Sequence, residues 1–163
     1  MAAMADAGVV FGPITTTNVG VLRVLNREIF PVHYTDSFYT DIVETPPGLS
    51  KYAFVDGLAV GAICCRVETT LQKRERVYIM TLGVLAAYRR QHVGAALLQS
   101  VLAYCKEAGM DHIYLHVQTS NAGAIRFYLG HGFQITQTIH NYYKHIVPPD
   151  CYILAKAFGR ASF

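Results

Sequence analysis

The chain has 163 residues, of which 52% are hydrophobic and 15% charged, and this composition excludes a disordered tail, a collagen-like fibre and a coiled coil. Its formal net charge of +3 is too small to indicate a nucleic-acid partner. No apolar run approaches the ~20 residues of a membrane-spanning helix, and the first residues lack the basic flank and apolar stretch of a secretory signal. We therefore expect a single domain over residues 1–163, with no nucleic-acid or membrane partner.

Hydrophobic spacing predicts the secondary structure in chain order. The first part of the chain predicts strand, helix, helix, strand and strand over residues 9–11, 19–29, 35–44, 52–55 and 58–67. Thr15 to Asn18 offer N-cap residues for the first helix, and Asp56-Gly57 suits the turn between the two later strands. The rest predicts strand, helix, strand, helix, strand and strand over residues 76–85, 93–105, 113–117, 122–129, 133–139 and 152–158. This order, βα(α)βββαβαββ, contains no internal repeat.

The cysteines and histidines lack the spacing of metal sites. None of the four cysteines belongs to a C-x-x-C pair, and no H-E-x-x-H sequence occurs. We therefore expect buried free thiols in a reducing compartment, and no metal ligands. The cysteines are Cys64, Cys65, Cys105 and Cys151.

The most informative segment is a strand, a basic turn and a helix over residues 78–98. A loop that enters a helix N-terminus offers unpaired backbone N–H groups and the positive end of the helix dipole, which together suit a pyrophosphate. Gly94 would let the backbone approach the phosphates closely, and Arg89 or Arg90 could add positive charge. On these residues alone, an ordinary solvated turn is the alternative.

Residues 89–94 read Arg-Arg-Gln-His-Val-Gly and resemble the acetyl-CoA signature Gln/Arg-x-x-Gly-x-Gly/Ala of the GNAT superfamily of N-acetyltransferases, with His92 in place of the first glycine. Residues 91–96 fit the same pattern two positions further on. We prefer the first register because Gly94 then stands three residues before Leu97-Leu98, as is usual in that family. Residues 121–133 are similar to a second GNAT segment, N-x-x-A-x-x-F-Y-x-x-x-G-F.

This resemblance implies the GNAT fold, an α/β (α+β) architecture with a mixed central sheet of about seven strands flanked by about four helices. It also implies acetyl-CoA as the co-substrate, without a metal. Four further runs resemble the N-terminal acetyltransferases of the NatE type, also called San-like, over nearly the whole chain. These runs are Phe30-Pro31-Val32-His33-Tyr34, Val77–Gly83, Tyr114–Gln118 and Asn141–Lys144. Enzymes of this type acetylate protein α-amines, typically those of an initiator Met followed by a hydrophobic residue.

By this resemblance, Tyr78 and His116 share removal of the amine proton through an ordered water, and Tyr128 protonates the leaving CoA thiolate. The acetyl group would move by direct attack in a ternary complex. The residues implied in acetyl-CoA binding are Leu82, Gly83, Val84, Arg89, Arg90, Gln91, His92, Val93, Gly94, Ala95, Asn121 and Tyr128. The residues implied in peptide binding are Phe30, Pro31, Val32, Tyr34, Met80, Tyr142, Tyr143 and Ile146.

Two other interpretations stay open at this point. A GNAT enzyme that acetylates lysine or a small amine would share the cofactor site and differ at the two aromatic loops. A weakly active GNAT-fold subunit would instead act as a scaffold in a NatA-like complex, which the departure at His92 favours. We expect protein or nascent-peptide N-termini and a NatA-like acetyltransferase complex as partners. The expected location is the cytoplasm, with the nucleus as a second compartment.

Overall fold

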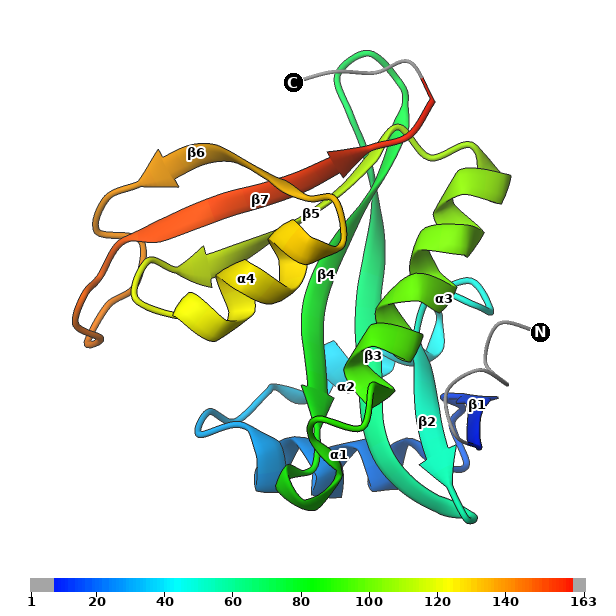
Figure 1. Ribbon diagram of the computed structural model, residues 1–163. Coiled ribbons are helices and arrows are strands. Elements are labelled where there is room, and N and C mark those ends of the chain that lie inside the picture. The colour runs from blue at the N-terminus through cyan, green and yellow to red at the C-terminus, as the bar shows by residue number, and fades with distance from the viewer. Residues whose placement is uncertain (1–7, 160–163) are drawn as a thin grey trace. The chain divides into compact units, whose positions relative to one another are not determined.

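The computed structural model describes residues 8–159 and places their helices and strands in the predicted order (Figure 1). The strands are β1 (Val9–Pro13), β2 (Lys51–Val55), β3 (Leu58–Thr69), β4 (Glu75–Val84), β5 (His112–Gln118), β6 (Gln134–Ile139) and β7 (Cys151–Ala157). The helices are α1 (Val19–Ile29), α2 (Asp36–Val43), α3 (Val93–Ala108) and α4 (Ala122–Gly130). A short 3₁₀ helix, η2 (Ala86–Tyr88), follows β4 and was not predicted.

The strands form one seven-stranded sheet in the order β1-β2-β3-β4-β5-β7-β6. β4 and β5 are parallel, whereas the recorded pairs β1–β2, β2–β3, β5–β7 and β6–β7 are antiparallel. The predicted mixed sheet with about seven strands and about four helices is therefore confirmed.

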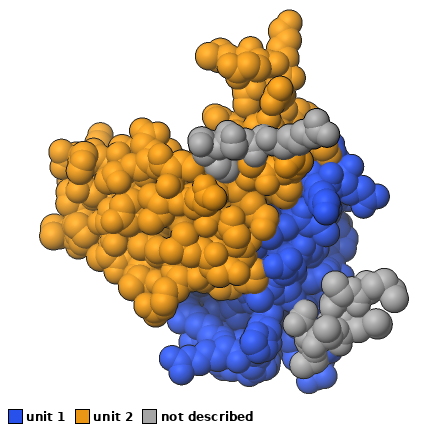
Figure 2. Space-filling view, turned by 45° about the horizontal axis from the view of Figure 1, so that its top comes forward, with its two compact units in different colours: residues 1–67, 79–108 blue, residues 68–78, 109–163 orange. Residues whose placement is uncertain are grey.

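The chain divides into two compact units (Figure 2). Unit 1 comprises Met1–Val67 and Ile79–Ala108, and unit 2 comprises Glu68–Tyr78 and Gly109–Phe163. β4 contributes to both, because it passes from unit 2 to unit 1 after Tyr78. The expectation of a single domain over residues 1–163 stays a prediction.

Unit 1 is built around an apolar core to which α1, α2 and the strands β2 and β3 contribute. Tyr52 on β2 is fully buried, and its hydroxyl donates to the Asn18 carbonyl at 2.7 Å and accepts from the Leu22 backbone N–H at 3.1 Å. Asn18 is the N-cap residue of α1, but its side chain makes no capping bond. The prediction that residues 15–18 supply the N-cap of α1 is therefore confirmed at Asn18, but the capping hydrogen bonds at this helix end come from the Tyr52 hydroxyl on β2.

All four cysteines are free and buried, as predicted. Burial raises the pKa of the Cys64 and Cys105 thiols to about 12, so both are protonated at neutral pH. Protonated, enclosed thiols are poor nucleophiles. Within residues 8–159, no helix is both long and apolar enough to cross a bilayer.

Candidate active site

β4 carries several of the predicted site residues on one face. Its burial alternates, with the odd-numbered residues from Val77 to Gly83 buried and the even-numbered ones half-buried. This is the period of two expected when one face of a strand lies against a core. The half-buried face carries Tyr78, Met80, Leu82 and Val84.

β4 and β5 form a parallel ladder that pairs Val77 with Ile113 and Tyr78 with Tyr114. We predicted that N–H groups near Leu82 and Val84, further along β4, hold the acetyl carbonyl. This assignment stays a prediction.

Unit 2 brings the two predicted proton-transfer residues together. The Tyr78 hydroxyl lies 2.8 Å from Nδ1 of His116, a hydrogen bond between neighbouring strands. The two rings meet edge to face, with centroids 5.5 Å apart. Such a pair can pass a proton between phenol and imidazole, so the geometry suits the acid–base role predicted from the sequence.

The second predicted peptide loop, between β6 and β7, lies against this pair. The Tyr142 ring stacks on the His116 ring, with centroids 4.5 Å apart and an interplanar angle of 11°. Tyr143 meets Tyr142 edge to face at 5.0 Å. Burial raises the pKa of the Tyr143 phenol, so its hydroxyl is a neutral hydrogen-bonding group at physiological pH.

The Asp150 carboxylate links the two ends of the β6–β7 loop. Asp150 accepts a hydrogen bond from the Asn141 backbone N–H at 2.9 Å and another contact from His140 at 3.1 Å. These two contacts lower the pKa of the Asp150 carboxyl, the Asn141 bond having the larger effect. The loop is also joined to the end of β5, since Gln118 donates to the Pro148 carbonyl at 2.8 Å. Ile146, the remaining predicted residue of this loop, is exposed.

Helix α4 carries two further predicted residues, Asn121 and Tyr128. Asn121 is the N-cap, and its side-chain oxygen accepts from the Ala124 backbone N–H at 3.2 Å, which leaves its amide NH₂ to donate outward. Tyr128 is buried and packs edge to face on Phe133 at 5.2 Å. Its assignment as the donor to the thiolate stays a prediction.

In unit 1, the basic turn leads directly into the N-terminus of α3. The first helical hydrogen bond runs from the Ala96 N–H to the His92 carbonyl, so the N–H groups of residues 93–95 have no partner within the helix. Arg89 folds back to donate to the Val84 carbonyl at 3.1 Å, whereas Arg90 is exposed. These donors fit the phosphates of a CoA-like ligand.

His92 adopts a conformation that favours glycine. Its φ is +65°, in the left-handed region, where histidine occurs more often than most non-glycine residues. The first register of the signature places a glycine at this position, whereas Gly94, the glycine of the second register, lies inside α3. The backbone therefore supports the first register and shows that histidine adopts the glycine conformation here.

The first predicted peptide loop, residues 30–34, joins α1 and α2 in unit 1. The Phe30 and Tyr34 rings meet edge to face at 6.1 Å, and Tyr34 stacks on Phe38 at 4.7 Å. A Cβ at Gly83 would lie 2.8 Å from the Phe30 ring, so β4 and this loop are in close contact. Pro31 and Val32 are exposed beside these rings, which makes an apolar surface that suits an uncharged side chain.

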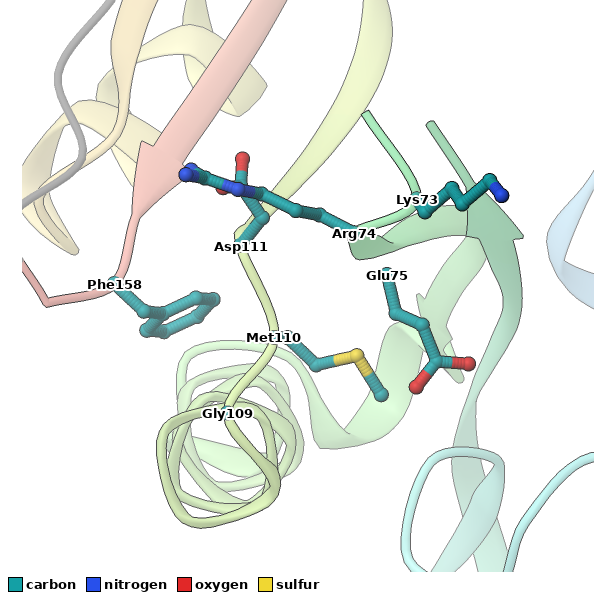
Figure 3. Close-up of a pocket in the computed structure, with 7 residues that line it drawn as sticks. All are labelled: Lys73, Arg74, Glu75, Gly109, Met110, Asp111 and Phe158. Atoms are coloured by element: carbon teal, nitrogen blue, oxygen red, sulfur yellow. The ribbon is translucent and has the colours of Figure 1, made fainter. Parts of the chain in front are cut away.

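A cavity of about 630 Å³ in unit 2 contains none of the predicted residues (Figure 3). It is lined by Lys73, Arg74, Glu75, Gly109, Met110, Asp111 and Phe158. Arg74 pairs with Asp111 at 3.0 Å, and hydrogen bonds from His112 and Arg74 lower the pKa of the Asp111 carboxyl. A paired carboxylate with a lowered pKa is a weak general base near neutral pH, so we assign no catalysis to this cavity.

Two residues near the Tyr78–His116 pair were not predicted, Tyr114 and Glu68. Tyr114 is two residues before His116 on β5, so the strand period could have placed both on one face. Glu68 comes from the end of β3, and no sequence spacing connects it to β5. Among residues 8–159, no group of three or more His, Cys, Asp or Glu side chains is placed to hold a metal ion.

Comparison with known proteins identifies the family to which the chain belongs. The model of the acetyltransferase (GNAT) family matches residues 21–133, and the chain belongs to this family. It is 49% identical over 147 residues to N-alpha-acetyltransferase 50 of Danio rerio, covering 90% of this chain and 86% of that protein. It is 41% identical over 160 residues to the probable N-acetyltransferase san of Drosophila melanogaster, covering 98% and 86%. A solved structure of Arabidopsis thaliana Naa50 in complex with the bisubstrate analogue CoA-Ac-MVNAL superimposes with a TM-score of 0.86, at 46% identity over 93% of this chain and 99% of that one.

Proposed function

We propose that this acetyltransferase moves acetyl from acetyl-CoA to the α-amine of a protein N-terminus that begins with Met followed by a hydrophobic residue. The observation that carries the proposal is the Tyr78–His116 hydrogen bond with Tyr142 of a predicted peptide loop stacked on the imidazole. Similarity to N-alpha-acetyltransferase 50, and to a structure whose analogue carries a Met-Val sequence, supports the α-amine and the Met.

The proposed chemistry needs a weak base. The pKa of an α-amine is near 7.7–8.0, so a usable fraction is neutral at physiological pH. The amine nitrogen attacks the thioester carbonyl, its proton passes to His116 with Tyr78 as relay, and the C–S bond breaks with protonation of sulfur by Tyr128. The buried, protonated Cys64 and Cys105 offer no thiolate for an acyl-enzyme, which supports direct transfer.

The residues proposed to hold acetyl-CoA are those of the basic turn and the α3 N-terminus, with Asn121 on α4. The N–H groups of residues 93–95, which have no partner within α3, would receive the pyrophosphate, and Arg90 would add charge. The peptide would use the aromatic residues of the two loops. Apolar surfaces of the kind that each loop offers suit the Met side chain at a chain end and disfavour a charged lysine.

The test uses acetyl-CoA and two peptides, one beginning Met-Leu and one with a blocked N-terminus and an internal lysine. We expect CoA release with the Met-Leu peptide and none with the blocked peptide. Tyr78→Phe and His116→Ala should each lower kcat by about 10²- to 10⁴-fold. Leu71→Ser, at a 98% exposed position, is the matched control and should retain full activity.

Three results would contradict the proposal. Turnover of the blocked peptide alone would indicate a lysine acetyltransferase. Full turnover by both Tyr78→Phe and His116→Ala would remove their assignment. If neither peptide is acetylated and the chain does not bind acetyl-CoA, the scaffold interpretation is favoured.

We also propose that the chain associates with a NatA-like acetyltransferase complex in the cytoplasm, with the nucleus as a second compartment. The support is the resemblance of four sequence runs to NatE-type enzymes. Affinity purification of the tagged chain from fractionated cells should recover NatA-like subunits with the cytoplasmic pool. Recovery of the chain without any acetyltransferase subunit would contradict the association.

A further inference from the structure

Tyr114 lies beside both members of the Tyr78–His116 pair. The strand register places Tyr114 directly opposite Tyr78, and their ring centroids are 4.9 Å apart. The centroid of the Tyr114 ring is 6.1 Å from that of His116. Since aromatic rings at these separations are in packing contact, the orientation of Tyr114 limits the positions open to the Tyr78 ring.

Glu68 fixes the hydroxyl of Tyr114. The Tyr114 hydroxyl donates to Oε1 of Glu68 at 2.6 Å, and Nε of Arg76 donates to the same oxygen at 2.9 Å. The Arg76 guanidinium also lies over the Tyr114 ring, 4.8 Å from its centroid. The Glu68 side chain is 19% exposed, so these charge-assisted bonds are largely shielded from water.

The four side chains come from three strands. Glu68 stands at the end of β3, Arg76 and Tyr78 on β4, and Tyr114 on β5. Because Glu68 bonds the Tyr114 hydroxyl and the Arg76 guanidinium lies over the Tyr114 ring, the ring cannot turn without breaking the bond to Glu68 or the contact with Arg76. The position of the Glu68 carboxylate therefore influences the position of the Tyr78 phenol, through the Tyr114 ring.

We propose that Glu68 and Tyr114 are positioning residues for the Tyr78–His116 pair, a role that rests on the proposed function. The Tyr114 hydroxyl donates a hydrogen bond to Glu68, so Tyr114 orients the neighbouring Tyr78 phenol and does not act as a base. Misplacement of a catalytic group by about 1 Å can cost on the order of 10²-fold in rate. The pair thus contributes to kcat through the geometry of Tyr78.

The test compares Tyr114→Phe and Glu68→Gln with the Leu71→Ser control. Tyr114→Phe keeps the ring and removes one hydroxyl, and Glu68→Gln keeps the shape and one acceptor oxygen, so both variants should fold. We expect Tyr114→Phe to lower kcat about tenfold, with the KM for acetyl-CoA unchanged, and Glu68→Gln to lower it less. In a Tyr78→Phe background, Tyr114→Phe should have no further effect on kcat, because its action passes through the Tyr78 hydroxyl.

A second readout does not depend on turnover. The ¹⁵N chemical shift of His116 Nδ1 reports its hydrogen bond to Tyr78, and we expect Tyr114→Phe to move it while Leu71→Ser leaves it unchanged. If the wild-type chain acetylates no peptide, the proposed function is refuted, and the Nδ1 shift still tests the positioning role. Unchanged kcat and an unchanged Nδ1 shift in Tyr114→Phe would overturn the inference. An equal loss of kcat in the wild-type and Tyr78→Phe backgrounds would also overturn it.

Discussion

Gly83→Ala tests the contact between β4 and the first peptide loop. An added Cβ would lie 2.8 Å from both the Ile29 Cγ2 atom and the Phe30 Cζ atom, whereas ordinary carbon–carbon contacts are about 3.5–4.0 Å. These atoms must therefore move by roughly 1 Å, and overpacking of this kind costs about 1–3 kcal/mol. Because the Phe30 carbons are the far end of a side chain in the loop, we expect Phe30 to move rather than the strand.

The assay measures separate KM values for peptide and acetyl-CoA. If about 1.4 kcal/mol of this overpacking cost opposes peptide binding at the first loop, the KM for the Met-Leu peptide rises about tenfold. Gly83 has no side chain, so its predicted contact with acetyl-CoA is through the backbone, whereas the added Cβ points toward Ile29 and Phe30. If the strand stays in place, the KM for acetyl-CoA should change by less than about twofold. Gly20→Ala is the control, because a Cβ there meets nothing within 4 Å and Gly20 lies in a helix, so stability should rise slightly.

Phe30→Leu shortens the ring that the new Cβ would meet. The increase in peptide KM caused by Gly83→Ala should therefore shrink in the Phe30→Leu background. The reasoning is refuted if Gly83→Ala leaves both the peptide KM and the melting temperature unchanged. A rise in the acetyl-CoA KM alone would show that the strand moves instead.

Two further predictions concern single hydrogen-bonding groups. Tyr52→Phe leaves the Leu22 N–H and the Asn18 carbonyl without their hydroxyl partner, so the free energy of unfolding in urea should fall by about 1–3 kcal/mol; a loss below about 0.5 kcal/mol would contradict the capping role. The pKa of Asp150 is lowered in the folded state, so its stabilisation of the loop is present above the ordinary carboxyl pKa of about 3.9 and is lost as pH falls through the lowered value. Because His140 also contacts Asp150, the test uses a His140→Gln variant, in which the Asn141 amide shift should stay constant from neutral pH to about 4 and change only below it. A transition between about pH 5 and 7 in that variant would show that another group holds the loop.

The sequence predicted the order of elements because each has a clear local period. The β5 pattern, for example, alternates over residues 113–117, and the structure buries Ile113, Leu115 and Val117. What the sequence did not predict depends on residues far apart in the chain. The cap of α1 comes from Tyr52, 34 residues after Asn18, and no local pattern connects the two.

The candidate site divides in the same way. The resemblance identified Tyr78 and His116, and the structure places them in hydrogen-bond contact. The strand period could have added Tyr114, because it shares a face of β5 with His116. Glu68 could not have been added, since its contact with Tyr114 spans 46 residues and depends on where β3 ends.

The stack of Tyr142 on His116 has a thermodynamic consequence under the proposed function. Tyr142 is 41% exposed, so an incoming peptide can contact its ring while the ring stacks on the imidazole. If the bound peptide favours one orientation of the Tyr142 ring, it changes the relative free energies of the protonated and neutral His116 imidazole, because that ring stacks on the imidazole. By reciprocity, the protonation state of His116 must change peptide affinity by the same factor. Peptide binding and the protonation of His116 are therefore thermodynamically coupled through this loop.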